Sequence, residues 1–297
     1  MKAANVSLPL FLCLLGSVFA ESDSSFYEKY LSQFDFFPQY FLRTDVSGFA
    51  LQKDSLFERN YLVESNHAFE FTFLSYKQQL YSIWDFKFQV NLGEIPGNVV
   101  FTVLAVNFII TPSFEYRTNG VRMRTGMEHR CFHEVDRKEY QVVHWNRVFL
   151  NTASDNFPVN EYWHPLAQKN GWTLKNRFAY NLSTSYYLKD FLWVDPTKIN
   201  GNNPRIFELQ WDTRYAVYRR RSWVLTADVD IAAGSWESPE RAKEYWQLSL
   251  GSHSFFRRGK QGVALYAKYI LDNLPVVDGV QRFSKDQLLE FGISFFN

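Results

Sequence analysis

Beyond its first twenty residues, the sequence has no apolar run near the roughly 20 residues that a membrane-spanning helix needs. Its charges almost cancel, because 32 Lys and Arg stand against 31 Asp and Glu and leave a formal net charge of +1. Only two of its 297 residues are cysteines, and we find no internal repeat or low-complexity tract. These absences exclude a helical membrane protein and a disulfide framework, and the balanced charge gives no reason to expect a nucleic-acid partner.

Residues 1–20 are typical of a cleavable signal peptide. They combine a positive start, an apolar core at 8–15 and a small-residue cleavage site that ends at Ala20. Cys13 lies inside the apolar core, and a lipoprotein anchor there is the less favoured alternative. Cleavage leaves Cys131 as the one remaining cysteine, so no internal disulfide can form. Export without a disulfide suits a closed barrel, whose strand pairing supplies the stability.

What the sequence does have is a two-residue alternation of apolar and polar side chains, which is clearest at 83–92, 207–217 and 223–231. A period of two indicates strands whose two faces meet different surroundings. Aromatic residues make up 19% of the chain, and a barrel can present them to lipid and at the membrane interfaces. We therefore predict an all-β fold, a transmembrane antiparallel β-barrel that is apolar outside and polar within.

From Ala68 onward we expect about a dozen strands, separated by turns rich in Gly, Asn and Pro. The candidates are 68–80, 83–93, 99–111, 113–118, 121–133, 140–152, 172–182, 186–194, 205–218, 222–233, 245–257, 262–272 and 287–296. Because such barrels have an even number of strands, twelve is the expected total. Residues 21–67 are expected to form a periplasmic N-terminal arm or plug, and 68–297 the barrel in the bacterial outer membrane. The last strand ends in aromatics and resembles the signal that outer-membrane assembly machinery reads, so that machinery is an expected partner.

The polar faces of these strands carry charges of both signs, which the barrel places in its lumen. These residues are Lys87, Arg147, Lys175, Arg177, Glu208, Asp212, Arg214, Asp228 and Asp230. One interpretation is a small selective pore, and the other is a lumen filled by charges that pair with one another. A barrel of about twelve strands is narrow, which favours the filled lumen. The basic run 219–221 predicts a solvated turn, or a turn that touches anionic lipid headgroups.

One outward face carries polar groups that need an explanation. On 121–133 the charged residues must face the lumen, so His129 and Cys131 face outward. On 140–152 the same rule turns Asn146 outward. His129, Cys131 and Asn146 are therefore expected on the outer wall of adjacent strands. Polar groups on a lipid-facing wall cost free energy unless they lie near an interface, so this set is the candidate site.

These residues resemble the site of outer-membrane phospholipase A, a twelve-stranded barrel that cleaves acyl chains from phospholipids. Residues 126–131 and 145–147 are similar to the family's His-x-Ser and Trp-Asn-Arg motifs, and 166–172 resembles its next turn. The resemblance implies His129 as the base, Cys131 as the nucleophile and Asn146 as the residue that orients the imidazole. It further implies calcium as cofactor, a homodimer, and membrane phospholipid and lipopolysaccharide as partners.

The chain departs from that pattern at several positions. Cys131 replaces the nucleophilic serine, His133 replaces a glycine, and Glu134 stands where an arginine is expected near the calcium site. The spacing from Cys131 to Asn146 is also slightly long. Residues 129–136 fit better with a His-Arg-Ser-Ser-His-x-Gly-Asp string from an uncharacterised family of bacterial outer-membrane barrels, which carries no agreed activity.

Three functions remain open for this wall. Cys131 could attack an ester once a close His129 removes its proton, because the thiolate is the active form and apolar surroundings disfavour it. The barrel could instead be catalytically inactive, with a structural or lipid-binding role or as a small pore. His129, Cys131 and His133 could also bind one metal ion, since residues two apart share a strand face.

Overall fold

The computed structural model describes residues 33–51, 63–93, 102–134, 142–154, 177–188, 205–220, 222–236, 243–258, 261–272 and 287–296. These residues form twelve strands. The strands are β1 (Phe34–Leu51), β2 (Val63–Tyr76), β3 (Leu80–Gly93), β4 (Thr102–Thr118), β5 (Val121–Glu134), β6 (Val142–Ser154), β7 (Phe178–Leu188), β8 (Arg205–Arg220), β9 (Trp223–Trp236), β10 (Lys243–Arg258), β11 (Gln261–Asp272) and β12 (Gln287–Phe296). Among the described residues, no helix is long and apolar enough to cross a membrane.

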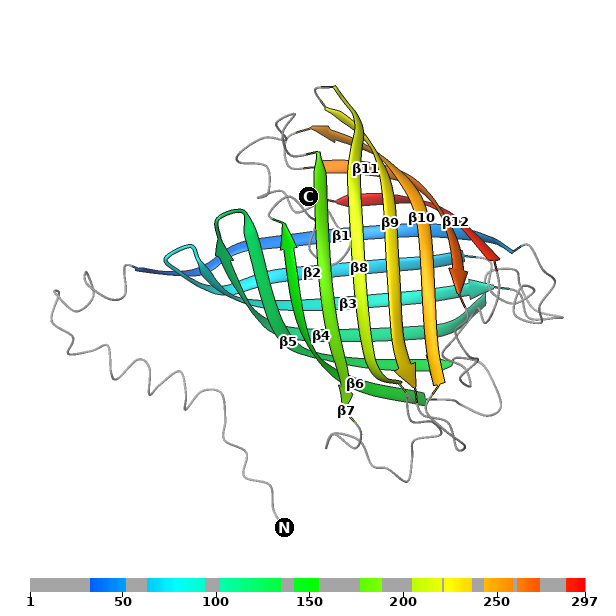
Figure 1. The fold of residues 1–297 in the computed structure, drawn as a ribbon, viewed down its shortest axis with the longest axis horizontal. Coiled ribbons are helices and arrows are strands. Elements are labelled where there is room, and N and C mark those ends of the chain that lie inside the picture. Colours follow the sequence, from blue (N-terminus) through cyan, green and yellow to red (C-terminus); the bar gives the residue numbers. More distant parts are fainter. Residues whose placement is uncertain are drawn as a thin grey trace, which may run out of the picture.

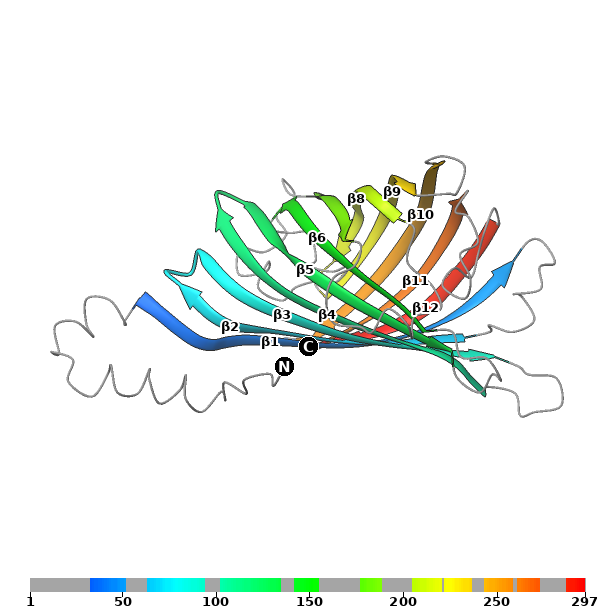
Figure 2. The ribbon, with the colours of Figure 1, turned by 90° about the horizontal axis from the view of Figure 1, so that it is seen from below.

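The strands pair antiparallel in chain order, and the last strand pairs with the first. The pairing of β12 with β1 closes the barrel, so the red and blue ribbons lie side by side in Figure 1. Figure 2 shows the same wall from below, with the strands following one another around it. The predicted fold, a closed antiparallel β-barrel of twelve strands, is confirmed.

Each strand presents polar side chains to the interior and apolar ones to the outside. On β9, Thr226 and Asp228 are 1% and 3% exposed, whereas Val229 and Ile231 on the other face are 37% and 39% exposed. Burying charges while exposing aliphatic side chains is unfavourable in water and favourable in a bilayer. The outer wall is therefore the lipid-facing surface.

The two ends of the barrel differ in the length of their connections. At the end where β1 begins and β12 ends, four hairpins turn over 77–79, 119–120, 221–222 and 259–260, and the fifth connection is 155–177. At the other end every connection is longer than these four, the shortest being 237–242. Outer-membrane barrels have short periplasmic turns and longer extracellular loops. The end that holds the start of β1 is therefore the periplasmic end.

The first strand corrects a prediction. We expected 21–67 to be an arm or plug, but Phe34–Leu51 is β1 and β2 begins at Val63, so both belong to the barrel wall. The alternation of β1 is interrupted at Phe37, whose φ is 50°, and the register with β2 shifts at this point. A strand with such an irregularity does not show an unbroken period of two. Residues 1–20, 21–32 and 52–62, with the signal peptide predicted there, lie outside the described residues.

Two predicted strand breaks are also wrong. The candidates 99–111 and 113–118 are one strand, β4, which continues through Pro112. Proline cannot donate to a ladder, and Pro112 pairs with β3 but is absent from the register with β5. On β5, Gly126 lies opposite Ser113 and leaves space for the β4 backbone, because a Cβ there would lie 2.4 Å from the carbonyl oxygen of Pro112. The candidates 172–182 and 186–194 are likewise replaced by the single strand β7.

Near the periplasmic end, apolar side chains replace charges inside the barrel. Six strands contribute to this buried cluster, which consists of Phe41, Ala216, Val224, Phe255, Ala264 and Phe296. The rings of Phe255 and Phe296 meet edge to face with centroids 6.4 Å apart. Apolar packing thus occupies the interior beside β1 and β8–β12 at this level, whereas Glu115, Arg117 and Arg122 keep ion pairs in the interior near the 119–120 turn.

Candidate functional site

The register between β5 and β6 brings the predicted outward residues together. His129 lies directly opposite Asn146, and Nδ1 of His129 is 2.8 Å from Oδ1 of Asn146. An amide oxygen only accepts hydrogen bonds, so Nδ1 of His129 carries the proton and Nε2 is the basic nitrogen. Asn146 therefore holds the imidazole in the tautomer that a general base requires.

The thiol of Cys131 has a neighbour that the predicted site did not pair with it. Its Sγ contacts Nε2 of His133, which lies two residues further along the same face of β5. Phe108 is opposite Cys131 on β4, and its ring meets that of His133 edge to face at 6.0 Å. These neighbours leave Cys131 only 8% exposed. The sequence signal for this contact is a spacing of two residues. It puts the side chains of His129, Cys131 and His133 on the same face of β5.

A second polar cluster on the outer wall escaped the sequence analysis. Oγ of Ser65 is 3.1 Å from Nε2 of His67, and Nδ1 of the same ring is 3.1 Å from Oγ1 of Thr44 on β1. A hydroxyl, an imidazole and a hydroxyl that orients it are the elements of a nucleophile–base pair. The cluster was missed because 63–67 was assigned to the N-terminal arm, where no outward face was considered.

The two clusters lie on one line of register across the wall. The strand registers place Thr44, His67, Phe88, Phe108 and Cys131 opposite one another in succession, from β1 to β5. The rings of Phe88 and Phe108 between the clusters are 5.1 Å apart. Polar residues on a lipid-facing wall are typical of the membrane interfaces. Each of these five residues lies in the extracellular half of its strand, so the row lies toward the extracellular end.

The site does not fit the calcium that the resemblance implies. Calcium binds oxygen ligands, whereas the described side chains of this site offer the imidazoles of His129 and His133, the thiol of Cys131 and a single amide oxygen, on Asn146. Among the residues that the structure describes, no three His, Cys, Asp or Glu side chains group in a way that could hold a metal ion. The alternative hypothesis, a metal ion bound by His129, Cys131 and His133, is therefore not supported by the arrangement of these side chains.

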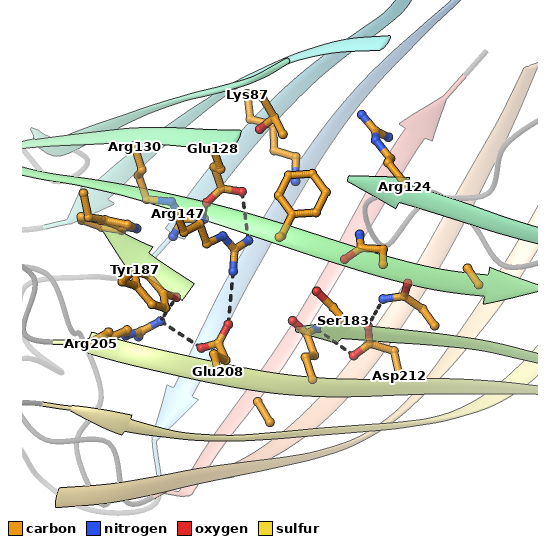
Figure 3. Close-up of a pocket in the computed structure, with 18 of the residues that line it drawn as sticks. Lys87, Arg124, Glu128, Arg130, Arg147, Ser183, Tyr187, Arg205, Glu208 and Asp212 are labelled. Atoms are coloured by element: carbon orange, nitrogen blue, oxygen red, sulfur yellow. Dashed lines mark hydrogen bonds and ion pairs between the residues drawn. The ribbon is translucent and has the colours of Figure 1, made fainter. Parts of the chain in front are cut away.

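Inside the barrel, a cavity of about 280 Å³ is crossed by ion pairs, as Figure 3 shows. Arg147 on β6 donates to Glu128 on β5 at 2.9 Å and to Glu208 on β8 at 3.2 Å. Glu208 also accepts from Arg205 at 3.2 Å and from the hydroxyl of Tyr245 on β10 at 2.7 Å. The carboxylate of Glu208 and the guanidinium of Arg147 thus link β8 to β6 and to β10, which are not its neighbours in the wall.

Two further networks fill other parts of the lumen. Arg124 donates to Glu70 on β2, to Asp85 on β3 and to a hydroxyl on β4. Arg214 and His253 both contact Asp228, with Nε of the arginine at 2.5 Å and Nδ1 of the histidine at 2.6 Å from its oxygens. The described charges predicted for the interior do lie there, and many of them pair. This pairing of charges is what the interpretation of a filled lumen predicts.

The closed wall, its apolar outside and its ion-paired inside define an outer-membrane β-barrel. No protein-family model matches the chain, and no curated protein matches it. Among solved structures it is similar to outer membrane phospholipase A from Escherichia coli, at 11% identity over 88% of this chain and 98% of that one, with a TM-score of 0.47. A calcium-bound dimer of the Salmonella typhi phospholipase (11% identity, 86% and 89% coverage, TM-score 0.44) and LpxR from Salmonella typhimurium (6%, 86% and 99%, TM-score 0.42) are also similar.

Proposed function

We propose that this barrel hydrolyses acyl esters of phospholipids in the bacterial outer membrane, with Cys131 as the nucleophile. The observation that carries the proposal is the outward-facing hydrogen bond between His129 and Asn146, two residues from a thiol that itself contacts His133. Nucleophile, base and orienting group lie on two adjacent strands, which hold them more rigidly than loops would. The site also opens toward lipid, where an acyl substrate reaches it without leaving the membrane.

The chemistry has two steps. In the first, the thiol proton passes to His133, the sulfur of Cys131 bonds to the acyl carbonyl carbon, and the ester C–O bond breaks. The leaving alcohol oxygen takes the proton from His133, so a lysophospholipid departs. In the second, a water molecule gives a proton to Nε2 of His129 and bonds to the acyl carbon. The C–S bond breaks, the fatty acid leaves, and the sulfur regains a proton from His129. This scheme keeps His129 as an oriented base and adds His133 as the first proton acceptor.

The level of the site fits this substrate. The row from Thr44 to Cys131 lies toward the extracellular end, where the outer leaflet meets the protein. Its apolar middle, Phe88 and Phe108, can contact acyl chains, while its polar ends supply the groups that could act on an ester. Phospholipid and lipopolysaccharide are accordingly the proposed neighbours in the membrane. A homodimer and delivery by outer-membrane assembly machinery complete the proposal for partners.

The test compares the purified protein with Cys131→Ala and Cys131→Ser in detergent micelles that contain phosphatidylcholine. We expect Cys131→Ala to lower the rate of fatty-acid release at least about 100-fold, since the nucleophile is gone. Cys131→Ser should keep a measurable rate, because a hydroxyl beside a base is also a nucleophile. Equal rates for the wild type and Cys131→Ala would overturn the proposal, provided that unboiled gels show both proteins folded.

Two histidine variants then separate the roles of the imidazoles. His133→Ala should abolish acylation, whereas His129→Ala and Asn146→Ala should leave a single burst of lysophospholipid followed by slow turnover. The burst would show that acylation continues while deacylation is impaired. A full loss of the burst in His129→Ala, with normal turnover in His133→Ala, would reverse the assignment of the two bases.

The cluster of Ser65, His67 and Thr44 supplies a second candidate nucleophile for the same reaction. Its carrying observation is the pair of 3.1 Å contacts that the His67 ring makes with the two hydroxyls. Ser65→Ala is therefore assayed beside Cys131→Ala. If only Ser65→Ala loses activity, the hydrolase belongs to β1 and β2 instead of β5 and β6.

A further inference from the structure

The outer wall carries a cluster of aromatic rings at the periplasmic ends of β8, β9 and β10. The ring of Trp223 is 4.9 Å from that of Tyr218 and stacks at 6.1 Å on that of Phe256. Nε1 of Trp223 donates to Oγ of Ser254 at 2.7 Å. Tyr and Trp side chains gather where the hydrocarbon core of the membrane meets the headgroups. This cluster therefore marks the inner interface of the outer membrane.

Two arginines lie two residues beyond this aromatic cluster, on the same outer face of β8 and β10. Arg220 follows Tyr218 by two residues on β8, and Arg258 follows Phe256 by two residues on β10. Both side chains are exposed, and neither forms an ion pair with any residue that the structure describes. Strand spacing and rise per residue put their Cα atoms roughly 12 Å apart, a gap that two arginine side chains can close from both sides. Both guanidinium groups thus lie at headgroup level.

Arg258 lines a largely apolar groove, and Arg220 lies two strands away from Arg258. The groove has a volume of about 680 Å³ and crosses the wall from the β8–β9 turn to β1. Arg258 and Ser222 line its polar edge, and Leu42, Val263 and Phe295 line its apolar floor. Leu42, Val263 and Phe295 point outward from β1, β11 and β12, so this side of the groove faces the bilayer, while the buried Arg43 and Phe296 line its inner side. An acyl chain of a membrane lipid can occupy it.

We propose that this groove binds an anionic glycerophospholipid of the periplasmic leaflet. The phosphate lies between Arg220 and Arg258, and an acyl chain lies along Leu42, Val263 and Phe295. Guanidinium groups suit phosphate because their donors are planar and permanently charged. A zwitterionic lipid adds an ammonium group that two arginines repel. The site therefore selects phosphatidylglycerol-type headgroups over phosphatidylethanolamine.

Native mass spectrometry of the detergent-purified protein tests this site with phosphatidylglycerol, phosphatidylethanolamine and lipopolysaccharide as probes. The Cys131→Ala variant is used throughout, so that hydrolysis of a probe cannot mimic its loss. We expect about tenfold greater retention of phosphatidylglycerol than of phosphatidylethanolamine, the size of effect that two cationic contacts produce. The double variant Arg220→Gln/Arg258→Gln should reduce phosphatidylglycerol to the level of phosphatidylethanolamine.

Lys77→Gln is the matched control, since Lys77 is an exposed cation on the β2–β3 turn at the same end of the barrel. It should retain phosphatidylglycerol as the parent does. Equal retention of the two phospholipids, or an unchanged preference in the double variant, would overturn the proposal. A double variant that loses lipopolysaccharide rather than phosphatidylglycerol would also overturn it, because this end would then face the outer leaflet.

Discussion

At the scale of single residues, Glu208 illustrates how the interior of the barrel accommodates charge. Its two carboxylate oxygens accept hydrogen bonds from Arg147, Arg205 and Tyr245, which lie on β6, β8 and β10. The carboxylate is 8% exposed, so its charge is stabilised by these donors rather than by bulk water. Removing that charge leaves two guanidinium groups without their shared partner.

Replacing Glu208 by Gln should therefore lower the free energy of unfolding by about 3 kcal/mol, the cost of breaking a buried ion pair from one side. Equilibrium unfolding in denaturant, with lipid micelles present, measures this change. Glu244→Gln is the control, because Glu244 is exposed on β10 near the same level. If both variants unfold at the same denaturant concentration, the luminal ion pairs do not stabilise the barrel.

At the scale of strands, the sequence predicts most of the wall because each lipid-facing strand must alternate along its length. The prediction fails where a local irregularity disturbs the period of two. Phe37, with positive φ, obscures β1, and Pro112 suggests a break where β4 continues. In both cases pairing with neighbouring strands holds the segment in the sheet, and such long-range pairing is not visible in a local window.

The candidate site, like the strands, was only partly predictable from the sequence. Alternation alone puts His129, Cys131 and Asn146 on one wall, and the register then brings His129 and Asn146 into contact. The contact between Cys131 and His133 depends on side-chain rotamers, which no sequence pattern specifies. The cluster at Ser65 could not be considered until β1 and β2 were known to be in the wall.

The close contact between Gly126 on β5 and the backbone of β4 gives a prediction about the stability of this strand pair. Gly126→Ala should destabilise the barrel by about 1–3 kcal/mol, because the new methyl group would collide with the backbone of Pro112 and with Ser113. Gly251→Ala is the control with a smaller expected loss, since its Cβ would meet the flexible Lys268 at 3.0 Å and the carbonyl oxygen of Ala267 at 3.2 Å, a milder approach than the 2.4 Å at Gly126. Unfolding midpoints that shift equally in the two variants would contradict this account of β4.

At the scale of the whole molecule, one physical division supports every functional proposal. The barrel is apolar toward the bilayer and ionic toward its lumen, and for that reason we propose the polar clusters and the groove beside Arg258 on the outer wall as lipid sites. If the wall faced water instead, His129, Cys131 and Ser65 would be ordinary surface residues. The orientation of the two faces is thus the claim on which the catalytic and lipid-binding proposals depend.

A spin-label scan of β9 in a Cys131→Ser background measures that orientation directly. Single cysteines are placed from Ala227 to Ile231, the protein is reconstituted in lipid, and each label is exposed to dissolved oxygen and to a water-soluble nickel chelate. We expect labels at 227, 229 and 231 to be relaxed by oxygen, which concentrates in the bilayer, and those at 228 and 230 to be shielded from it. Oxygen access without a two-residue period, or strongest at 228 and 230, would contradict the account.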